Sequence, residues 1–531
     1  MTQLRRILLA FSLPLAFLLT ACSDYDIPVS RPPVMRMADA TLVTRTSAVV
    51  HAYIQTDHPA QFYFEYGEET GPLTATAGLT PQGDSVHCAL SDLTPGTPYL
   101  CRLCSHNGRV KTQSADIRFV TVPYDLPTVS SPTPIAHGPV SYILAYQILS
   151  DGGAPILRSG CRVKNLNSGE TLTCLAESPA VEGEEQRVTI HSLERLTPYE
   201  FIPFAVNAEG ESAGPSLCVT TDNSIHLADG GLLPSLMQDD HHDYAELTFS
   251  GCMQGDDFRC LRELSVTQLN LADVSIIPGG AAYIPSRYTQ TDTVGYGLFS
   301  SMPVSRVVLP LTAVAVEEQA FKDCSLLTSV VMPAQATHIL PSDGCTSLAE
   351  IEVPAANSSY CSIDGVLYDA SVSRIVWMPL GKTTPYTLPS TITSIGAYAF
   401  RGCHFSSFVM GSQVTEMGQA AFYDSWVEQV TLSDALATVP TATFQQCARL
   451  AEVRLGSGTE QLGSYVFDGT CLAHLYVSAE YPPVCYSNTF ATLDGYDLFA
   501  RCTLHVPAAT KSLYRNHPYW GKFSKIISLE Q

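Results

Sequence analysis

The feature that most limits how this chain can fold is a phenylalanine that returns at a nearly constant interval. The regular copies, which lie 22, 22, 23 and 23 residues apart, are Phe400, Phe422, Phe444, Phe467 and Phe490. Phe299 and Phe321 are separated by the same step of 22 residues. A unit of this length cannot enclose a core alone, so successive units have to stack on one another. The interval therefore predicts a solenoid of repeated coils.

Around these phenylalanines the sequence repeats a longer pattern. Residues 395–403 have the sequence Ile-Gly-Ala-Tyr-Ala-Phe-Arg-Gly-Cys, and similar segments occupy 316–324, 417–422, 439–447 and 462–467. A short apolar strand follows eight or nine residues after each phenylalanine. This pattern resembles the BspA-like leucine-rich repeat family, with its motif Ile-x-x-x-Ala-Phe-x-x-Cys-x-x-Leu-x-x-Val-x-Leu-Pro. The resemblance implies a leucine-rich repeat solenoid over residues 232–531, with a C-terminal cap from about residue 502.

Upstream of the repeats, short strands alternate with turns rich in Gly, Pro, Asp and Asn. Ala48, Val50, Ala52 and Ile54 alternate with other residues, as expected for a half-buried strand. Two tyrosines, Tyr99 and Tyr199, each follow a Leu-Thr-Pro sequence and lie 22 residues before a closing threonine.

These two tyrosines resemble the tyrosine corner of fibronectin type III domains, where the hydroxyl bonds back to the backbone. The resemblance implies two fibronectin type III-like β-sandwiches, at residues 35–123 and 124–222, with a generic immunoglobulin-like sandwich as the alternative. A linker containing Gly230 and Gly231 is expected to separate them from the repeats. The predicted fold class is thus mainly β and multidomain, with two sandwiches before a leucine-rich repeat solenoid.

The N-terminus has the features of an export signal. Arg5 and Arg6 precede an apolar run from Ile7 to Leu19, which is too short to span a bilayer comfortably. The Leu-Thr-Ala-Cys sequence that ends at Cys22 resembles the lipobox of bacterial lipoproteins. The resemblance implies a signal peptide at residues 1–21, a diacylglycerol on Cys22 and a tether at residues 22–34.

The residues after Cys22 bear on where the anchored protein is displayed. Asp24 and Asp26 resemble the surface-export signal of Gram-negative lipoproteins, which implies a lipid anchor in the outer membrane and a chain that faces the exterior. The alternative is an ordinary secretory signal cut after Ala21. No later segment approaches eighteen apolar residues, so the N-terminal lipid is the only membrane attachment expected.

Composition excludes one class of partner and supports folded domains. Acidic residues outnumber basic ones by 51 to 29, for a formal net charge of −22. A nucleic acid backbone would be repelled over most of such a surface, so no nucleic acid partner is expected. With 45% hydrophobic and 15% charged residues, the chain has enough apolar material for packed cores.

The cysteines favour a structural role. Among the 17 cysteines, Cys324, Cys403 and Cys447 lie three residues after a repeat phenylalanine, and Cys345 has a similar place. Copies with serine or threonine at that position predict buried free thiols rather than disulfides or metal ligands. Cys101 and Cys104 have no second Cys-x-x-Cys pair to complete a zinc site. Disulfide pairing among the cysteines of the sandwiches stays open; these are Cys88, Cys101, Cys161, Cys174 and Cys218.

Other chemistry is not expected. Residues 239–243, Asp-Asp-His-His-Asp, are the only dense group of candidate ligands, and solvated surface or an incidental cation site are the two interpretations. Hydrolase, metalloprotease, phosphate-binding and dinucleotide-binding motifs are absent from the sequence. We therefore expect no enzyme activity, no cofactor and no metal.

The strands of the repeats predict a binding face. Residues in a strand alternate between core and solvent, and the predicted inward residues are Val330, Ile351, Val430, Val453 and Leu475. The neighbouring positions should then tile one exposed sheet. The candidate binding residues are Glu350, Glu352, Gln429, Thr431, Glu452, Arg454, His474 and Tyr476. Arg454 and Tyr476 are the best candidates, because Arg and Tyr are enriched at binding hot spots.

The function that follows is adhesion or capture of an extracellular or host protein by the solenoid, because members of the BspA-like family bind extracellular-matrix and plasma proteins. Two alternatives stay open: a glycan-binding accessory lipoprotein of a polysaccharide-uptake system, and an architectural spacer that binds nothing. The presence of only three tryptophans, Trp377, Trp426 and Trp520, weighs against the glycan alternative without removing it. The sequence does not identify the ligand or the oligomeric state.

Overall fold

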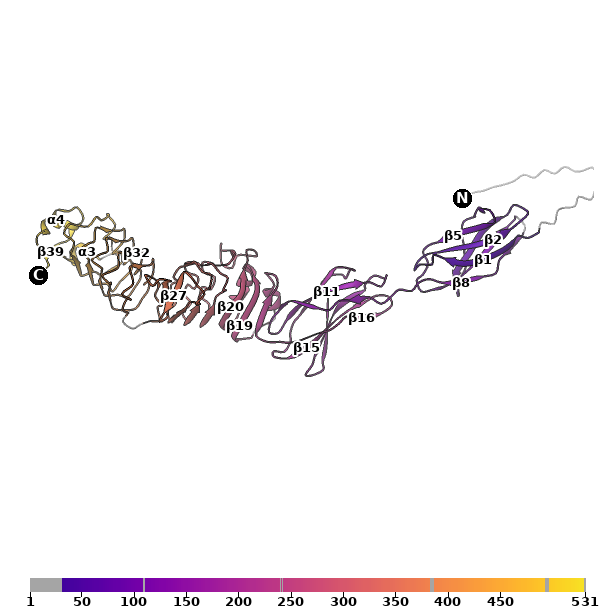
Figure 1. The fold of residues 1–531 in the computed structure, drawn as a ribbon, viewed down its shortest axis with the longest axis horizontal. Helices are drawn as coiled ribbons and strands as arrows, with labels where there is room; N and C mark the ends of the chain where they lie inside the picture. The colour runs from indigo at the N-terminus through magenta and orange to yellow at the C-terminus, as the bar shows by residue number, and fades with distance from the viewer. Residues whose placement is uncertain are drawn as a thin grey trace, which may run out of the picture. The chain divides into compact units, whose positions relative to one another are not determined.

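The computed structural model describes residues 31–107, 110–238, 240, 242–382, 386–491 and 496–529. The chain divides into two compact units after Asp125 (Figure 1). The first unit is one β-sandwich, and the second contains another β-sandwich followed by a solenoid. Within the described residues, no helix is both long and apolar enough to cross a membrane. The mainly β fold class predicted from the sequence is confirmed.

The first sandwich packs a three-stranded sheet against a five-stranded one. The three-stranded sheet has the order β1 (Val34–Thr41), β2 (Ala48–Gln55) and β5 (Ser85–Leu90). The other sheet has the order β4 (Thr74–Ala75), β3 (Gln61–Glu68), β6 (Pro98–His106) and β7 (Lys111–Gln113), with β8 (Ile117–Val120) also on β6. The inward residues expected in β2, from Ala48 to Ile54, are all buried. This arrangement is the fibronectin type III-like sandwich that the sequence predicts.

The second sandwich repeats this topology. One sheet has the order β14 (Glu185–Ile190), β11 (Tyr142–Ser150) and β10 (Thr133–His137), and β9 (Thr128–Val129) also pairs with β11. The facing sheet has the order β13 (Thr171–Leu175), β12 (Arg158–Asn165), β15 (Pro198–Val206) and β16 (Glu211–Ala213), with β17 (Leu217–Thr220) also on β15.

Both sandwiches contain the predicted tyrosine corner. The N–H of Thr94 donates to the Tyr99 hydroxyl at 2.8 Å, and the N–H of Glu194 donates to the Tyr199 hydroxyl at 2.9 Å. In the first sandwich the closing threonine, Thr121, donates its hydroxyl to the carbonyl of Thr94 at 2.6 Å. The constant spacing of 22 residues therefore reflects one loop geometry used twice.

The second sandwich and the solenoid share one continuous sheet. β18 (Ser224–Leu227) pairs antiparallel with β10 and parallel with β19 (Tyr244–Met253), the first long strand of the solenoid. The expectation of a linker at Gly230 and Gly231 is therefore wrong. The Gly231 N–H donates to the buried Asp257 carboxylate at 2.6 Å, and a φ of 90° at Gly231 turns the chain back instead of extending it.

Two short helices cover the start of the solenoid. α1 (Leu233–Leu236) follows the turn, and α2 (Gly255–Leu261) carries Asp257 near its N-terminus. The guanidinium of Arg262, directly after α2, donates to the carbonyls of Gly297 and Leu298, both at 3.1 Å. The first coil thus has its loop held by side chains of the α2 region.

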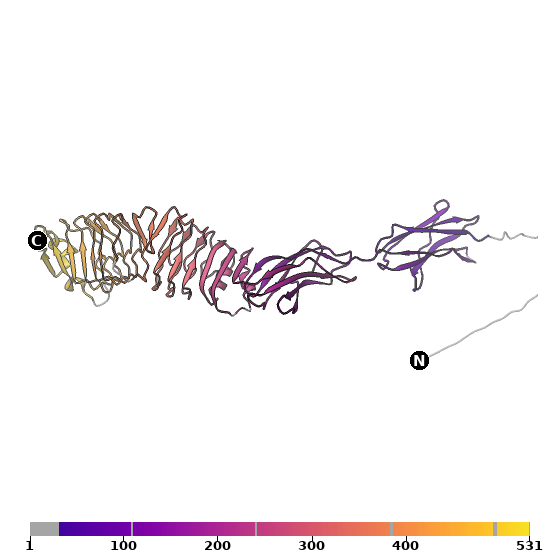
Figure 2. The same cartoon turned by 60° about the horizontal axis from the view of Figure 1, so that its bottom comes forward.

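The N-terminal half of the solenoid, as we call residues 244–353, extends the sheet of the second sandwich. After β19 the parallel strands are β20 (Val266–Ile276), β22 (Arg306–Val308), β24 (Ser329–Val331) and β26 (Glu350–Glu352). A narrow second sheet is formed by β21 (Thr293–Val294), β23 (Ala315–Val316) and β25 (His338–Ile339). Figure 2 shows the strands of successive coils side by side.

An antiparallel segment of three strands, residues 360–377, separates the two halves of the solenoid. It is called the insertion hairpin below. Its strands are β27 (Tyr360–Ile363), β28 (Val366–Asp369) and β29 (Arg374–Trp377). Leu367 and Trp377 pack into the core of the N-terminal half, whereas Tyr368 and Ile375 pack into the core of the C-terminal half. Leu367 and Tyr368 point to opposite faces of β28, as successive residues of a strand do, so the hairpin separates the two cores.

The C-terminal half, residues 386–529, rebuilds the same coil. Its main parallel sheet has the order β31 (Ser407–Val409), β33 (Gln429–Thr431), β35 (Glu452–Leu455), β37 (His474–Val477), β38 (Thr503–Val506) and β39 (Lys525–Ser528). The short strands of the opposite side are β30 (Ser394–Ile395), β32 (Glu416–Met417), β34 (Thr438–Val439) and β36 (Gln461–Leu462).

The repeated phenylalanines form the predicted stack in the core. Successive ring centroids from Phe400 to Phe490 lie 5.0, 5.4, 6.1 and 5.9 Å apart, and Phe299 and Phe321 are 5.3 Å apart. All of these rings are buried. The 22-residue interval is therefore the length of one coil.

The last coil is closed by aromatic residues. α3 (Leu498–Arg501), α4 (Lys511–Asn516) and a 3-10 helix η1 (Trp520–Lys522) lie at this end. Tyr514, Trp520 and Phe523 are buried, and Trp520 and Phe523 pack edge-on against Phe490. The Trp520 indole N–H donates to the carbonyl of Pro483 at 2.8 Å. These residues cover the final core, as a terminal cap must.

Candidate binding surface

The structure places the predicted binding residues on two different sheets. Glu350 and Glu352 lie on β26 in the sheet of the N-terminal half, and the other six lie on β33, β35 and β37 in the C-terminal half. The expected inward residues are buried, with exposed fractions of 0–1%. The insertion hairpin interrupts the single tiled face that the sequence suggests, because its antiparallel strands stand between β26 and β31.

On the N-terminal sheet the charges are paired with one another. Arg306 on β22 donates to Glu352 on β26 at 2.7 Å and to the Ser329 hydroxyl on β24 at 2.9 Å. This arginine lies across three strands and covers Ser329, which is buried although the sequence suggests that it faces solvent. The hydrogen bond with Glu352 raises the pKa of Arg306. Glu350 is exposed at the edge of the same group.

On the C-terminal sheet, strand register brings three flat side chains into a row. Arg454, Tyr476 and His505 occupy the same level on β35, β37 and β38. The Arg454 guanidinium carbon lies 3.8 Å from the centre of the Tyr476 ring, and the Tyr476 and His505 rings stack with centroids 4.0 Å apart. Thr431 on β33 continues the level. We call Arg454, Tyr476 and His505 the stacked row.

The adjacent level adds charge and hydrogen bonds to the stacked row. Glu452 pairs with Arg454 at 2.8 Å, and a His474 Nδ1 to His505 Nε2 hydrogen bond spans 3.1 Å. Gln429 on β33 precedes Glu452 and His474 at this level. Gln429, Arg454 and His474 are exposed, whereas Thr431, Glu452 and Tyr476 are half-buried. The row is therefore open to solvent but fixed by its neighbours.

His505 is the member of the surface that the sequence analysis missed. It belongs to Leu504-His505-Val506-Pro507, which the sequence analysis would place in the cap rather than in a repeat strand. The alternation of buried Leu504 and Val506 around it was the signal that could have found it. Burial lowers the pKa of His505, and His474 and Arg454 lower it further. A neutral imidazole is therefore favoured beside the guanidinium.

The cysteines of the repeats behave as predicted. Cys324, Cys345, Cys403 and Cys447 are buried and carry free thiols. Cys324 and Cys447 donate their S–H groups to the carbonyls of Phe299 and Phe422, each at 2.9 Å. Burial raises the pKa of Cys447 to about 12 and that of Cys324 to about 11. These thiols are structural rather than reactive.

In the sandwiches, register brings two cysteines opposite each other. Cys161 on β12 and Cys174 on β13 are direct cross-strand partners, and both are free thiols in the structure. Cys101 and Cys104 are both buried in the first sandwich. Burial raises the pKa of Cys161 and of Cys101 to about 12.

The acidic and histidine-rich segment falls at the start of the solenoid. Asp239 and His241 lie outside the described residues. The carboxylate of Asp240 is buried and accepts hydrogen bonds from the Tyr244 hydroxyl at 2.6 Å and from His242 Nδ1 at 2.8 Å. Among the residues that the structure describes, no group of three or more His, Cys, Asp and Glu side chains is arranged to hold a metal ion. Asp240 serves the local fold here.

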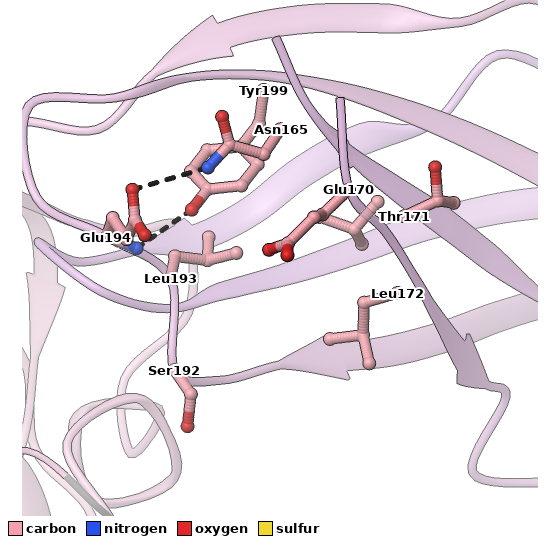
Figure 3. Close-up of a pocket in the computed structure, with 9 residues that line it drawn as sticks. Asn165, Glu170, Thr171, Leu172, Ser192, Leu193, Glu194 and Tyr199 are labelled. Atoms are coloured by element: carbon pink, nitrogen blue, oxygen red, sulfur yellow. Dashed lines mark hydrogen bonds between the residues drawn. The ribbon is translucent and has the colours of Figure 1, made fainter. Parts of the chain in front are cut away.

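The second sandwich has a cavity of about 490 Å³ beside its tyrosine corner (Figure 3). Glu170 and Leu172 lie on one side of it, and Ser192, Glu194 and Tyr199 lie on the other. The Asn165 amide donates to the Glu194 carboxylate at 3.3 Å, so the corner loop is tied to the end of β12. The Asn165 amide and the Tyr199 hydroxyl thus both hold the corner loop at Glu194.

The lipid attachment site predicted at Cys22 lies outside the described residues, as do the signal peptide and most of the tether.

The coils define a leucine-rich repeat solenoid, and the sequence comparisons identify its type. Residues 284–364 and 377–492 match the family model for the BspA type leucine rich repeat region, in six copies. These two segments of the solenoid are therefore BspA-type leucine-rich repeats. No curated protein sequence matches the chain.

Solved structures similar to this chain include two bacterial repeat proteins. A leucine-rich repeat protein from Eubacterium ventriosum has 17% identity and a TM-score of 0.34, covering 56% of this chain and 94% of its own. A leucine rich cell surface protein from Faecalibacterium prausnitzii has 18% identity and a TM-score of 0.36, covering 62% and 97%. A two-domain fibronectin type III segment of chicken tenascin has 16% identity and a TM-score of 0.19, covering 35% and 98%.

Proposed function

We propose that this chain is a lipid-anchored surface protein that binds an extracellular protein through the main sheet of the C-terminal half. The observation that carries the proposal is the stacked row on the open face of that sheet. Arg and Tyr are the side chains most often found at the energetic centre of protein interfaces. Here both stand on strands, at fixed positions, rather than on loops.

The packing of the stacked row lowers the cost of binding. A long Arg side chain loses conformational entropy when a partner immobilises it. Arg454 is already held by Glu452 at 2.8 Å and by the Tyr476 ring, so much of that loss is incurred on folding. The flat Tyr476 and His505 rings beside it offer apolar area with polar edges, which suits a protein partner.

The aromatic rings of the C-terminal sheet favour this choice of sheet. Both sheets hold an arginine in an ion pair, Arg306 with Glu352 at 2.7 Å and Arg454 with Glu452 at 2.8 Å, so these pairs do not distinguish them. The Arg306 guanidinium also bonds to the Ser329 hydroxyl. The C-terminal sheet, by contrast, presents exposed Arg454, His474 and Gln429 around one half-buried aromatic ring. A solenoid sheet of this kind provides an extended surface that a protein partner can cover.

A binding panel tests the proposal. The full chain is applied to immobilised extracellular-matrix and plasma proteins, with a glycan array in parallel. The double variant Arg454→Glu with Tyr476→Ala should bind the captured protein at least tenfold more weakly, which is about 1.4 kcal/mol. The matched control is Arg306→Glu, the same charge reversal on the other sheet, which should bind as the unmodified chain does. Undiminished binding by the double variant, or capture of no protein at all, would contradict the proposal.

The anchor is tested separately, by membrane fractionation of cells that express the chain. Changing Cys22→Ala should leave the protein unprocessed or released, because the diacylglycerol supplies most of the expected membrane affinity. Unchanged retention of a processed chain would rule out the lipid anchor.

A further inference from the structure

A second candidate site lies where the insertion hairpin replaces a regular coil. The chain returns from this hairpin through residues 378–382, which lack the Ala-Phe-x-x-Cys loop of the other coils. At Gly381 the chain passes directly against the preceding coil, where the Gly381 N–H donates to the carbonyl of Leu348 at 2.7 Å. A cavity of about 300 Å³ remains at this edge of the solenoid. We call it the notch; its walls include Asp343, Thr346, Leu380, Arg401, His404 and Trp426.

Two glycines flank the notch. In each coil, the residue before the repeat cysteine position has a positive φ; it carries a side chain at Asp323, Asp424 and Gln446 and is a glycine at Gly469. The coils on the two sides of the notch have Gly344, with a φ of 71°, and Gly402, with a φ of 69°. A Cβ added at Gly402 would meet the side chain of Leu380 at 3.4 Å. A Cβ added at Gly344 would instead meet the Asp323 backbone at 2.7 Å. The space therefore results from the short crossing and from the missing side chain at Gly402.

One wall of the notch is an aromatic stack. His404, Trp426 and Arg449 occupy neighbouring positions in three successive coils. The His404 and Trp426 ring centroids are 4.2 Å apart, and the Arg449 guanidinium carbon lies 4.1 Å from the centre of the Trp426 ring. Trp426 is 46% exposed, whereas Trp377 and Trp520 are buried. His404 ends the stack at the notch, because the matching position across it is Thr346, which has no ring.

The notch also holds fixed polar groups. Arg401 forms ion pairs with Asp343 and, at 3.5 Å, with Glu318. Its guanidinium also lies 5.2 Å from the ring of Tyr398 and 4.8 Å from that of Tyr423. Arg401 therefore has one orientation, with donors and acceptors side by side at the notch.

The charge of the notch selects against charged ligands. Three carboxylates line it, from Asp323, Asp343 and Asp424, together with the cations of Lys322 and Arg401. An anion would meet the carboxylates and a cation would meet Lys322 and Arg401. A hydroxyl group both donates and accepts, so it can bond to either kind of side chain. The wall thus suits a neutral molecule with several hydroxyls.

We propose that the notch binds one neutral sugar ring, stacked on His404 at the end of the His404–Trp426–Arg449 row. The C–H groups of one sugar face would lie against the negative face of the aromatic ring. The ring hydroxyls would bond to Asp343, Arg401 and the acids beside them. A cavity of about 300 Å³ is at the small end of ligand sites, which fits one ring at a chain end rather than a long oligosaccharide.

Trp426 provides a direct reporter for the test. The full chain is applied to a glycan array that displays terminal neutral hexoses, N-acetylhexosamines, sialic acids and uronic acids. Methyl glycosides of the bound sugars are then titrated while tryptophan fluorescence is followed. Because the other two tryptophans are buried, the fluorescence change should be confined to Trp426 and should disappear in Trp426→Phe. Terminal neutral sugars should bind, and the acidic ones should not.

Two variants examine the notch itself. His404→Ala removes the stacking surface and should weaken sugar binding at least tenfold. Gly402→Asn restores a side chain at a backbone position that asparagine tolerates, and should also abolish binding by filling the space. The matched control is Gln446→Asn, which places the same residue at the same coil position away from the notch, and it should bind normally. Melting temperatures show that each variant folds.

Three results would overturn this proposal: capture of no neutral glycan, preference for acidic glycans, or binding that survives both His404→Ala and Gly402→Asn. The outcome is independent of the stacked row, because Arg454→Glu with Tyr476→Ala leaves the notch intact and should still bind the sugar.

Discussion

The two halves of the solenoid use the same coil but differ at their ends and on their surfaces. The N-terminal half, from β19 to β26, extends the sheet of the second sandwich, whereas the C-terminal half, from β31 to β39, ends in an aromatic cap. On the first sheet Arg306 pairs with Glu352, and on the second Arg454 pairs with Glu452 and also stacks on Tyr476. The comparison teaches that the repeat fixes the core and leaves the surface free to vary.

The two halves also differ in how their cores connect to the second sandwich. Separate apolar clusters fill the two halves, and the insertion hairpin lies between them. The cluster of the N-terminal half includes Ala136 and Ile143 of the second sandwich. We therefore expect the second sandwich and the N-terminal half to unfold together. Destabilising the C-terminal half should not destabilise the second sandwich.

The largest expected effect comes from the buried rings. Phe422→Ala or Phe444→Ala should destabilise the C-terminal half by about 3–5 kcal/mol, because each removes a fully buried ring and leaves a cavity. Hydrogen exchange on the full chain should show lost protection in residues 386–529 and retained protection in the second sandwich. Phe321→Ala is the matched change in the other half, and it should loosen the second sandwich as well. If Phe422→Ala lowered hydrogen-exchange protection equally in both halves, the two cores would not be independent.

A smaller effect is expected from the base of the stacked row. His505→Ala should weaken binding of the captured protein by about 0.5–1.5 kcal/mol, because Tyr476 loses the ring on which it stacks. His338→Ala changes an exposed histidine of the N-terminal half and serves as the control. Surface plasmon resonance with both variants measures the difference. If His338→Ala weakened binding more than His505→Ala does, the binding face would lie on the N-terminal half and the present assignment would be wrong.

The repeat cysteines should tolerate their natural substitutes. Cys447→Ser should cost about 1 kcal/mol, since a hydroxyl can still donate to the Phe422 carbonyl and serine already stands at the equivalent Ser425. Chemical denaturation monitored in the C-terminal half measures the change. Cys324→Ser is the matched variant in the N-terminal half, and a cost several times larger in either half would indicate that the thiol does more than fill space.

The smallest effect is a dependence of stability on pH. Burial, His474 and Arg454 lower the pKa of His505, with Glu452 opposing and Lys525 also lowering it. The unfolded chain then binds a proton at higher pH than the folded chain does. The stability from this group should be complete above the ordinary histidine pKa of about 6.5 and should decline as pH falls toward the lowered value.

Thermal melting of the C-terminal half between pH 7.5 and pH 5 checks this slope. His505→Asn should reduce it; the slope that remains comes from His517, whose pKa is also lowered by burial. Burial and His226 lower the pKa of His137 in the second sandwich. Because this sandwich shares a core with the N-terminal half, the stability of the N-terminal half should change with pH in the same direction. A C-terminal half that gains stability on acidification would contradict the assigned direction for His505.

The sequence by itself determined the coil, its length and its buried residues. A period of 22 or 23 residues can be satisfied only if equal positions stack, so Phe400 to Phe490 and the cysteines three residues on had to be interior. Alternation within the strands likewise assigned Val430, Val453 and Leu475 to the core. The tyrosine corners followed from local spacing in the same way.

Only the tertiary structure decided what lies beside what on the surface. The Gly230-Gly231 segment has the composition of a linker, yet Asp257, distant in sequence, turns it into a bonded corner within a continuous sheet. His505 joins Arg454 and Tyr476 because the register of β37 and β38 aligns them, and no local pattern encodes that register. The notch arises because one coil is shortened between two others. Such features depend on which chain segments become neighbours, and a periodic sequence constrains the neighbours of its core far more tightly than those of its surface.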